Sequence, residues 1–297
     1  MEFRTNRVRT LLGGAVALMM FGVPSKADLS SFDLGWNIEN DQTGPSTVLP
    51  FGTFFSAYAY MPTAGDFTSG TLTYPGPGSP QALSPGSFGG PNVYYQTPYL
   101  ADLPALEAAY PFGTYTVQAS GPSGPSSTVG IDYTAEAYGN TPSLTAGSFN
   151  ALQGLNPLLS DTVNFNGFTP NGAASQAFVF FNVYNVGTGA DVFADNFLAS
   201  STASVVIPGG TLAADTAYSY ELIYDDRIYG VDTNGSGIPT QQEFDTRTFG
   251  NFTTTPEPGS YAAVLLVLGS LILLARLRRA HGTPANNNPA EARQIGI

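Results

Sequence analysis

The chain has no cysteine, and its single histidine, His281, stands close to the C-terminus. The lack of cysteine excludes disulfide frameworks, cysteine-ligated zinc, iron–sulfur clusters and thiol nucleophiles. Residues 28–255 also contain no lysine, so the usual general bases of serine and cysteine enzymes and the amine of Schiff-base chemistry are missing there. Because only carboxylate and tyrosine chemistry remains, the sequence predicts a protein that is not an enzyme.

Positive charge is scarce in the same stretch. Residues 28–255 hold 19 carboxylates and only two cations, Arg227 and Arg247, within a 297-residue chain of net charge −12. A surface this acidic repels the phosphate backbone of nucleic acids, and two isolated arginines do not make a basic patch. We therefore exclude nucleic acid as a partner.

Charged residues of either sign make up only 11% of the chain, whereas glycine (34), proline (23), phenylalanine (20) and tyrosine (16) are abundant. This composition favours short strands joined by many turns and excludes a helical bundle. The hydrophobic fraction of 42% is sufficient for packed cores. The sequence therefore predicts an all-β fold.

The first 27 residues have the pattern of an export signal. Three arginines precede an apolar run over residues 11–23, and a small-x-small pattern ends at Ala27. This order of charge, apolar run and cleavage site is typical of a secretory signal peptide. We expect cleavage between Ala27 and Asp28.

A second pattern near the C-terminus has three parts. A Pro-Glu-Pro motif is followed by an apolar run over residues 261–275 and then by an arginine cluster. The residues are Pro256, Glu257 and Pro258 in the motif and Arg276, Arg278 and Arg279 in the cluster. As a helix the run would span about 22 Å, a minimal transmembrane helix, and the arginines would hold its far end in the cytoplasm.

This three-part pattern resembles the PEP-CTERM sorting signal of Gram-negative bacteria that make exopolysaccharide. The resemblance covers residues 256–280 and implies recognition in the membrane by an exosortase. It also implies that the mature protein is released or anchored at the cell surface or beyond. A polar tail over residues 281–297 follows, where such proteins usually end sooner.

Between the two ends, short alternating or aromatic runs are bounded by glycine, proline, asparagine and serine. In the first half we expect strands at residues 53–60, 70–74, 93–97, 113–119 and 129–138, a helix at 103–110 and a long loop at 74–91. In the second half we expect strands at residues 160–168, 178–186, 192–197, 202–207, 217–228 and 243–252. The sequence thus predicts two β-sandwich domains, over residues 28–143 and 144–255, the second with the strand density of an immunoglobulin-like sandwich.

One segment of the second half carries a further resemblance. Leu212 stands six residues before Tyr218, and the strand after it alternates between apolar and polar side chains. This spacing resembles the tyrosine corner of fibronectin type III domains. The resemblance implies that the Tyr218 hydroxyl bonds back to the backbone of the preceding turn.

Residues 232–243 match the spacing of an EF-hand calcium loop, with oxygen ligands at positions 1, 3 and 5, glycine at 6 and glutamate at 12. The candidate ligands are Asp232, Asn234, Ser236 and Glu243. The preceding residues are strand-like rather than helical, and Pro239 occupies a position whose backbone N–H is normally used. A plain loop joining the last two strands is therefore the competing interpretation.

Two other groups of side chains could carry a function. The aromatic candidates for stacking on a sugar are Tyr58, Tyr60, Tyr94, Tyr95 and Tyr99. Among the acids, Asp225 and Asp226 form the densest pair, but neighbouring strand residues point to opposite faces. We therefore interpret that pair as a solvated strand end, and a carboxylate-based hydrolase would need a cleft where other acids converge.

With the sorting-signal resemblance, these patterns predict an exported surface or extracellular-matrix protein with a structural or adhesive role. The alternative is a module that binds polysaccharide or calcium at the cell surface. Apart from calcium, no cofactor is expected. The expected partners are the exosortase, an exopolysaccharide and, before processing, the membrane.

Overall fold

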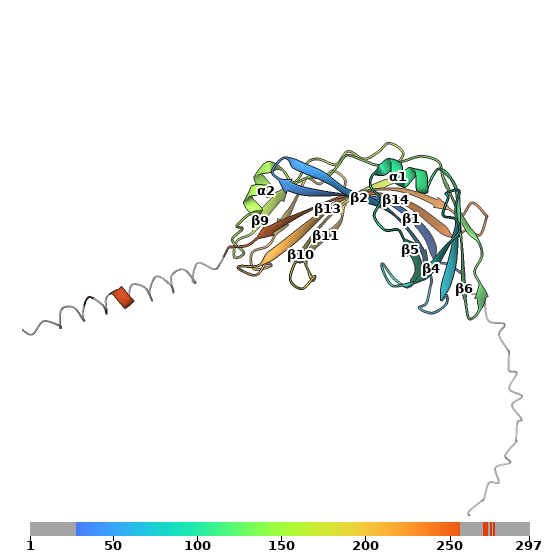
Figure 1. Ribbon diagram of the computed structural model, residues 1–297, viewed down its shortest axis with the longest axis horizontal. Helices are drawn as coiled ribbons and strands as arrows, with labels where there is room; N and C mark the ends of the chain where they lie inside the picture. The colour runs from blue at the N-terminus through green and yellow to red at the C-terminus, as the bar shows by residue number, and fades with distance from the viewer. Residues whose placement is uncertain (1–27, 256–269, 273, 275, 277–297) are drawn as a thin grey trace, which may run out of the picture.

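The computed structural model describes residues 28–255, 270–272, 274 and 276 (Figure 1). The signal peptide at 1–27, the motif at 256–258, the arginines at 278 and 279 and the tail at 281–297 lie outside the described residues. Of the predicted span at 261–275, only residues 270–272 and 274 are described. Within the part that is described, no helix has both the length and the apolar character needed to cross a bilayer.

The chain is all-β, as predicted, and twelve of its strands form one sheet. The order of strands is β11-β10-β13-β14-β1-β2-β5-β4-β3-β6-β7, and β8 pairs with β6; β9 and β12 form a separate two-stranded sheet. The strands are β1 (Ser31–Gly44), β2 (Thr47–Tyr60), β3 (Ser69–Thr73), β4 (Gln81–Gly86), β5 (Asn92–Gln96), β6 (Gly113–Gly121), β7 (Gly124–Pro125), β8 (Val129–Tyr133), β9 (Asp161–Asn164), β10 (Gln176–Asn185), β11 (Asp191–Ala199), β12 (Ser204–Ile207), β13 (Ala217–Val231) and β14 (Pro239–Thr253). Two short helices, α1 (Leu103–Ala109) and α2 (Ala146–Leu152), complete residues 28–255.

Two sequence predictions about these elements were wrong. Residues 74–91 are not one long loop, because β4 lies inside them and its Leu83 is buried in the core. No strand was predicted at β1, although β1 is central to the sheet. The helix expected at 103–110 is confirmed by α1.

The main sheet joins the two halves of the chain. β14 lies between β13 and β1, and its pairing with β1 is parallel, from Phe32 opposite Thr240 to Asp41 opposite Phe249. The long β13–β14 hairpin therefore provides an edge on which the first strand of the chain completes its hydrogen bonding. Strands from both sides of the predicted 143/144 boundary share one sheet, and the boundary itself stays a prediction.

The hydrophobic interior nevertheless divides into two clusters. One contains Trp36 and is built mainly from residues 29–137, with Phe244 added from β14. The other contains Tyr220 and is built from residues 144–252. In register across β1, β14 and β13, Trp36 stands opposite Phe244, and both clusters are made from the even-numbered residues of these strands. Because successive strand residues alternate between faces, both cores lie on the same face of the sheet.

Trp36 is the centre of the first core. Its ring packs against Tyr133 at 4.1 Å, Phe55 at 5.3 Å, Phe244 at 5.4 Å and Tyr115 at 5.8 Å between centroids. These partners come from β2, β6, β8 and β14. The sheet therefore folds back on itself, and β6 and β8 cover β1 and β2.

The second core lies between β10, β13 and the small sheet of β9 and β12. Four alternate residues of β13 face it: Tyr218, Tyr220, Leu222 and Tyr224. The Tyr218 hydroxyl accepts a hydrogen bond from the Ala213 N–H at 2.8 Å, which confirms the backbone bond expected of a tyrosine corner. The alternation in β13 thus buries one face, as predicted.

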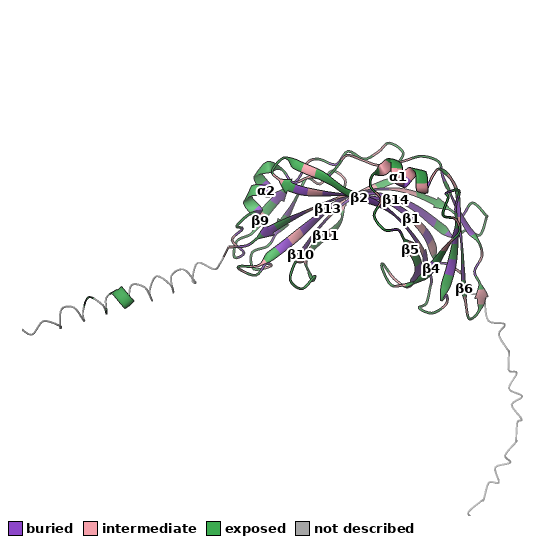
Figure 2. Ribbon diagram, viewed as in Figure 1, coloured by how far each residue is buried: buried purple, intermediate pink, exposed green. Residues whose placement is uncertain are grey.

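The sheet is strongly curved. Figure 1 shows it as an arch, with β10 and β11 at one end and β4, β5 and β6 at the other. Burial follows the strands across the arch, with buried and exposed residues alternating along them (Figure 2). The face opposite the two cores, which we call the free face, carries a large cavity lined by side chains of β1, β13 and β14.

Candidate functional site: a polar groove on the free face of the sheet

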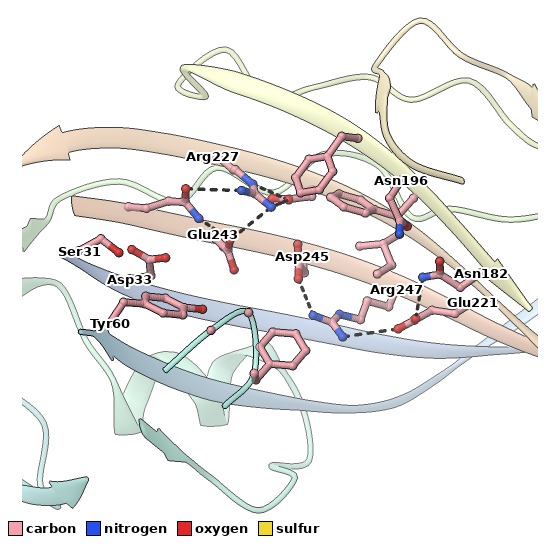
Figure 3. A pocket seen from close by; sticks show the side chains of 18 of the residues that line it. Ser31, Asp33, Tyr60, Asn182, Asn196, Glu221, Arg227, Glu243, Asp245 and Arg247 are labelled. Carbon is pink, nitrogen blue, oxygen red and sulfur yellow. Dashed lines mark hydrogen bonds and ion pairs between the residues drawn. The ribbon is translucent and has the colours of Figure 1, made fainter. Parts of the chain in front are cut away.

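A cavity with a volume of about 910 Å³ lies on the free face of the sheet. Side chains from β11 and residues 88–91, which precede β5, line it together although five strands separate β11 from β5 in the sheet. A second cavity of about 510 Å³ shares Phe88, Glu243 and Arg247 with it. We call these two joined cavities the groove; Figure 3 shows the larger one.

The groove floor is formed by odd-numbered residues of three central strands. Asn37 of β1 stands opposite Asp245 of β14, which stands opposite Asp225 of β13. Two residues earlier in β1, Gly35 stands opposite Glu243 of β14. A Cβ atom at Gly35 would lie 2.6 Å from the Ser56 Oγ. Glycine thus keeps the floor open beside Glu243.

The two arginines of residues 28–255 both lie on this floor. Arg227 is paired with Asp225 at 2.6 Å and with Glu243 at 3.3 Å. Its guanidinium also lies 5.3 Å from the centroid of Phe178 and 5.6 Å from that of Phe197. Carboxylates on one side and aromatic faces on the other hold Arg227 in place.

Arg247 is held in the same manner. It pairs with Asp245 at 2.6 Å and with Glu221 at 3.4 Å, and it donates to the Asn37 Oδ1 at 3.1 Å. Phe54 lies beneath the guanidinium, 5.9 Å from it. Each arginine is therefore ion-paired with two carboxylates of the floor, which makes the network a fixed part of the groove.

Burial raises the pKa values of several acids in the groove. Loss of solvent raises the pKa of Asp33 to about 6, although a hydrogen bond with Ser31 opposes the shift. Loss of solvent, reinforced by the charge of Asp245, raises the pKa of Glu243 to about 7. The same two causes raise the pKa of Asp225 well above its usual range. At neutral pH the groove therefore holds carboxyl groups that a nearby cation would ionise further.

Three buried acceptor oxygens on this face receive no hydrogen bond from the described residues. They are the Oδ1 atoms of Asn182, Asp225 and Asp245. Each of these side chains lines the larger cavity and is more than nine-tenths buried. One buried donor on the groove floor, the Arg247 Nε, likewise has no hydrogen-bond partner among the described residues.

Aromatic rings form a platform beside the acids. Tyr58 stacks on Tyr60 at 6.0 Å and on Tyr94 at 6.1 Å, and Phe88 lies 5.6 Å from it. Tyr94 is 38% exposed, and Tyr99, which donates to the Glu39 Oε2 at 2.7 Å, is 53% exposed. Tyr94 and Tyr99 therefore expose part of their ring surface along the groove.

Four of the five tyrosines singled out from the sequence thus meet on one face. Tyr58, Tyr94 and Tyr99 line the smaller cavity, and Tyr60 lines the larger one. Tyr95 does not join them, because it points to the opposite face, where its hydroxyl lies 3.0 Å from that of Tyr110.

The acidic pair at 225–226 divides between the two faces, as predicted. Asp225 faces the groove, whereas the Asp226 Oδ2 accepts a hydrogen bond from the Asn171 N–H at 3.2 Å. The interpretation as a solvated strand end was wrong, since Asp225 is 1% exposed and Asp226 is fully buried. Asp225 is buried among Arg227 and the neighbouring acids of the floor, and Asp226 is buried against Asn171 on the other face, contacts that the sequence of a single strand cannot reveal.

The loop predicted as a calcium site joins β13 to β14. The Asp232 carboxylate accepts hydrogen bonds from the N–H groups of Gly130, Asn234 and Ser236 at 2.5–2.9 Å. Glu243 does not approach Asp232, because it lies in β14 opposite Arg227, about 13 Å along the ladder from the loop. No group of three or more acidic or histidine side chains in the described residues is arranged to hold a metal, and calcium binding stays a prediction.

The residues assigned to export lie at the borders of the described chain. The Asp28 carboxylate accepts hydrogen bonds from the Ser127 N–H at 3.1 Å and Oγ at 2.8 Å. Of the sorting-signal residues, Arg276 alone is described, and Ala27, Pro256, Glu257, Pro258, Arg278 and Arg279 lie outside the described residues.

Sequence reasoning missed most of the groove acids. Asp33, Glu39, Glu221 and Asp245 were not singled out, and Glu243 was assigned to the calcium loop. A partial signal was present, because polar residues occupy most of the odd-numbered positions of β13 and β14: Ser219, Glu221, Asp225, Arg227, Gln241, Glu243, Asp245 and Arg247. Converging acids are what a hydrolase would need, but Asp225, Glu243 and Asp245 are each ion-paired with an arginine.

Comparisons with known proteins leave the family open. No family model matches the chain. No curated protein matches it either.

Solved structures with some similarity to the chain include the following three. The first is from a study of host cell surface retention of a 1.5-MDa bacterial ice-binding adhesin (15% identity, 78% of this chain and 66% of the other, TM-score 0.21). The second is the FN1–FN3 domains of chicken CNTN1 (7% identity, 75% of this chain and 67% of the other, TM-score 0.24). The third is the BSP domain of a biofilm-associated protein (10% identity, 78% of this chain and 30% of the other, TM-score 0.21). The chain spans less than two thirds of the adhesin chain, and similarities with TM-scores this low carry no argument about function.

Proposed function

We propose that the protein is exported to the cell surface or extracellular matrix and has an adhesive role there, binding polysaccharide in the groove. The observation that carries this proposal is the platform of Tyr58, Tyr60 and Tyr94 beside a polar floor. Aromatic faces offer apolar contact to sugar rings, while carboxylate, amide and guanidinium groups bond to hydroxyls.

Export is supported by the two ends of the sequence. The signal-peptide pattern at 1–27 and the PEP-CTERM-like pattern at 256–280 agree on one topology, with the acidic β-domain outside. An exosortase would act on the precursor while the helix at 261–275 holds it in the membrane. The two-sandwich organisation, with a fibronectin type III-like second sandwich, belongs to the same proposal, and the Tyr218 hydrogen bond supports it.

The proposed activity is binding, not turnover. Four acids of the groove are ion-paired with Arg227 and Arg247. Such a network fixes the shape and charge of a surface, whereas a glycosidase needs one carboxyl group free to donate a proton and another free to attack or activate water.

The proposal can be tested by measuring binding of purified protein to a glycan array and then, by calorimetry, to the best oligosaccharides. Replacing Tyr94 by alanine should weaken binding about tenfold, because stacking contacts of this size are worth about 1 kcal/mol or more. Phe112→Ala is the matched control, since Phe112 is also an exposed aromatic residue but lines neither cavity. Equal loss in both variants, or release of reducing ends from a bound glycan, would contradict the proposal.

A further inference from the structure

We infer that the groove selects a cationic glycan, a sugar chain with free amino groups, over neutral or acidic chains. This inference rests on the proposed binding of polysaccharide and concerns the chemical class of that ligand. Charge, unpartnered acceptors and the position of the aromatic platform lead to it independently.

Acidic side chains greatly outnumber basic ones in the groove. Seven carboxyl groups line the two cavities against two arginines: Asp33, Glu39, Asp191, Glu221, Asp225, Glu243 and Asp245. Both arginines are already paired on the floor, so neither is available to an acidic ligand. A polymer of uronic acids or sulfated sugars would meet net repulsion along the whole groove.

The unpartnered polar atoms of the groove also favour a ligand with ammonium groups. The buried Oδ1 atoms of Asn182, Asp225 and Asp245 are three acceptors without a donor, against one unpartnered donor, the Arg247 Nε. A buried acceptor left without a hydrogen bond costs about 1–3 kcal/mol. An ammonium group brings three donors and no acceptor, and sugar hydroxyls supply further donors.

The aromatic platform and the acidic floor lie next to each other in the groove. Phe88, which packs against Tyr58 of the platform, lines both cavities, as does Glu243 on the acidic floor. Asp33 stands directly opposite Tyr58 in the pairing of β1 with β2. A sugar ring on the platform would therefore place its substituents over the acids, where an amine gains a charge-assisted hydrogen bond.

Binding of a cation should also release protons. Burial holds the pKa of Asp33 near 6 and that of Glu243 near 7, so part of each group is protonated near neutral pH. The other charged groups facing them are Asp225, Asp245, Arg227 and Arg247. A positive charge beside these acids lowers their pKa and expels the proton.

The test uses three hexasaccharides of one length that differ in charge: a glucosamine hexamer, its fully N-acetylated counterpart and a galacturonate hexamer. At a pH where the amines are protonated, calorimetry should give at least about tenfold tighter binding of the glucosamine hexamer than of the acetylated one. It should give no measurable binding of the galacturonate hexamer. Repeating the titration in buffers of different ionisation enthalpy should reveal net proton release by the protein for the glucosamine hexamer only.

Asp33→Asn should lower affinity for the glucosamine hexamer about tenfold and leave the acetylated hexamer unchanged. Asp132→Asn is the matched control, because it removes the same charge from an exposed site on β8 that lines neither cavity. Thermal unfolding of each variant verifies that the fold is retained. Asn182→Ala provides a second variant, since it removes an unpartnered acceptor without changing charge.

The outcomes separate the inference from the function on which it rests. Equal affinity for the glucosamine and acetylated hexamers, or tighter binding of the galacturonate hexamer, would overturn the cationic selectivity while polysaccharide binding stands. Failure of every glycan to bind would overturn both. Tight binding of calcium or magnesium ions alone, lost in Asp33→Asn, would replace the amine by a metal ion and overturn the inference.

Discussion

Asp225 and Asp245 face each other directly across β13 and β14 on the groove floor. The Oδ2 of Asp225 is bound by Arg227 and that of Asp245 by Arg247, each at 2.6 Å, whereas neither Oδ1 accepts a hydrogen bond from the described residues. The repulsion between two carboxylates placed in this way is one cause of the raised pKa of Asp225, after its burial. Protonation of this floor is therefore coupled to the stability of the fold.

We expect the protein to become more stable as the pH falls from about 7 to about 4. The pKa values of Asp33 and Asp226 are raised by burial to about 6 and that of Glu243 to about 7, so the native state binds more protons than the unfolded chain in this window. Stability that is fully present below the unfolded pKa values is lost as the pH rises through the folded ones. Urea denaturation at a series of pH values measures this; a flat profile would contradict it, and Asp226→Asn should reduce the slope.

Removing the charge of Arg247 should destabilise the fold strongly near neutral pH. Arg247→Met leaves Asp245 and Glu221 buried without their counter-ion, at a cost of about 3–5 kcal/mol. The double variant Arg247→Met/Asp245→Asn should recover much of the loss. Denaturant unfolding of the single and double variants measures the effect, and equal stability of the two would refute the importance of the pair.

Trp36 should be the most costly core side chain to truncate in the first cluster. It contacts four aromatic rings and is 1% exposed, so Trp36→Ala should lower the free energy of unfolding by about 3–5 kcal/mol. As the single tryptophan of the chain, it should also give blue-shifted fluorescence that moves to longer wavelength on unfolding. Emission at the wavelength of a solvated indole in the native protein would contradict this burial.

Tyr218→Phe tests the hydrogen bond at the start of β13. The change leaves the Ala213 N–H without its acceptor and should cost about 1 kcal/mol of unfolding free energy. Tyr94→Phe serves as the control, because it removes a hydroxyl from an exposed ring. If both variants melt at the temperature of the wild type, the Tyr218 bond has no role in stability.

Processing at the C-terminus is expected close to residues 256–260 in a host that has an exosortase. The mature chain would then extend from about Asp28 to Pro258, and mass spectrometry of protein from the native matrix would detect it. Replacing Pro256 and Pro258 by alanine should leave the precursor uncleaved. Recovery of wild-type protein with residues 280–297 still attached would contradict the processing step.

The elements predicted well are those whose two faces differ in polarity. In β13 the alternation of Tyr218, Tyr220 and Leu222 with polar residues is enough to predict a strand with one buried face. β1 was missed because its last part, from Glu39 to Gly44, is polar on both faces. That polarity arises from the groove on one side and from tertiary hydrogen bonds, such as Asn40 to the Arg247 carbonyl, on the other.

The site was only partly predictable for a related reason. Aromatic residues could be named from the sequence as possible sugar contacts, and four of the five meet in the groove. Which acids accompany them depends on the register of β14 with β1, a parallel pairing between the two ends of the domain. No local pattern encodes a pairing over such a distance, so Asp33 and Glu243 could not be brought together from sequence spacing alone.

The parallel pairing of β1 with β14 also sets an order of events for the growing chain. Asn40 meets the carbonyl of Arg247, which lies 207 residues later, and both a ribosome and a translocation channel deliver the N-terminus first. Until β14 emerges, one edge of β1 has no partner and the binding floor does not exist. The groove can therefore form only after the chain as far as β14 has been synthesised, so the ligand binding proposed above would be acquired late in the emergence of the chain.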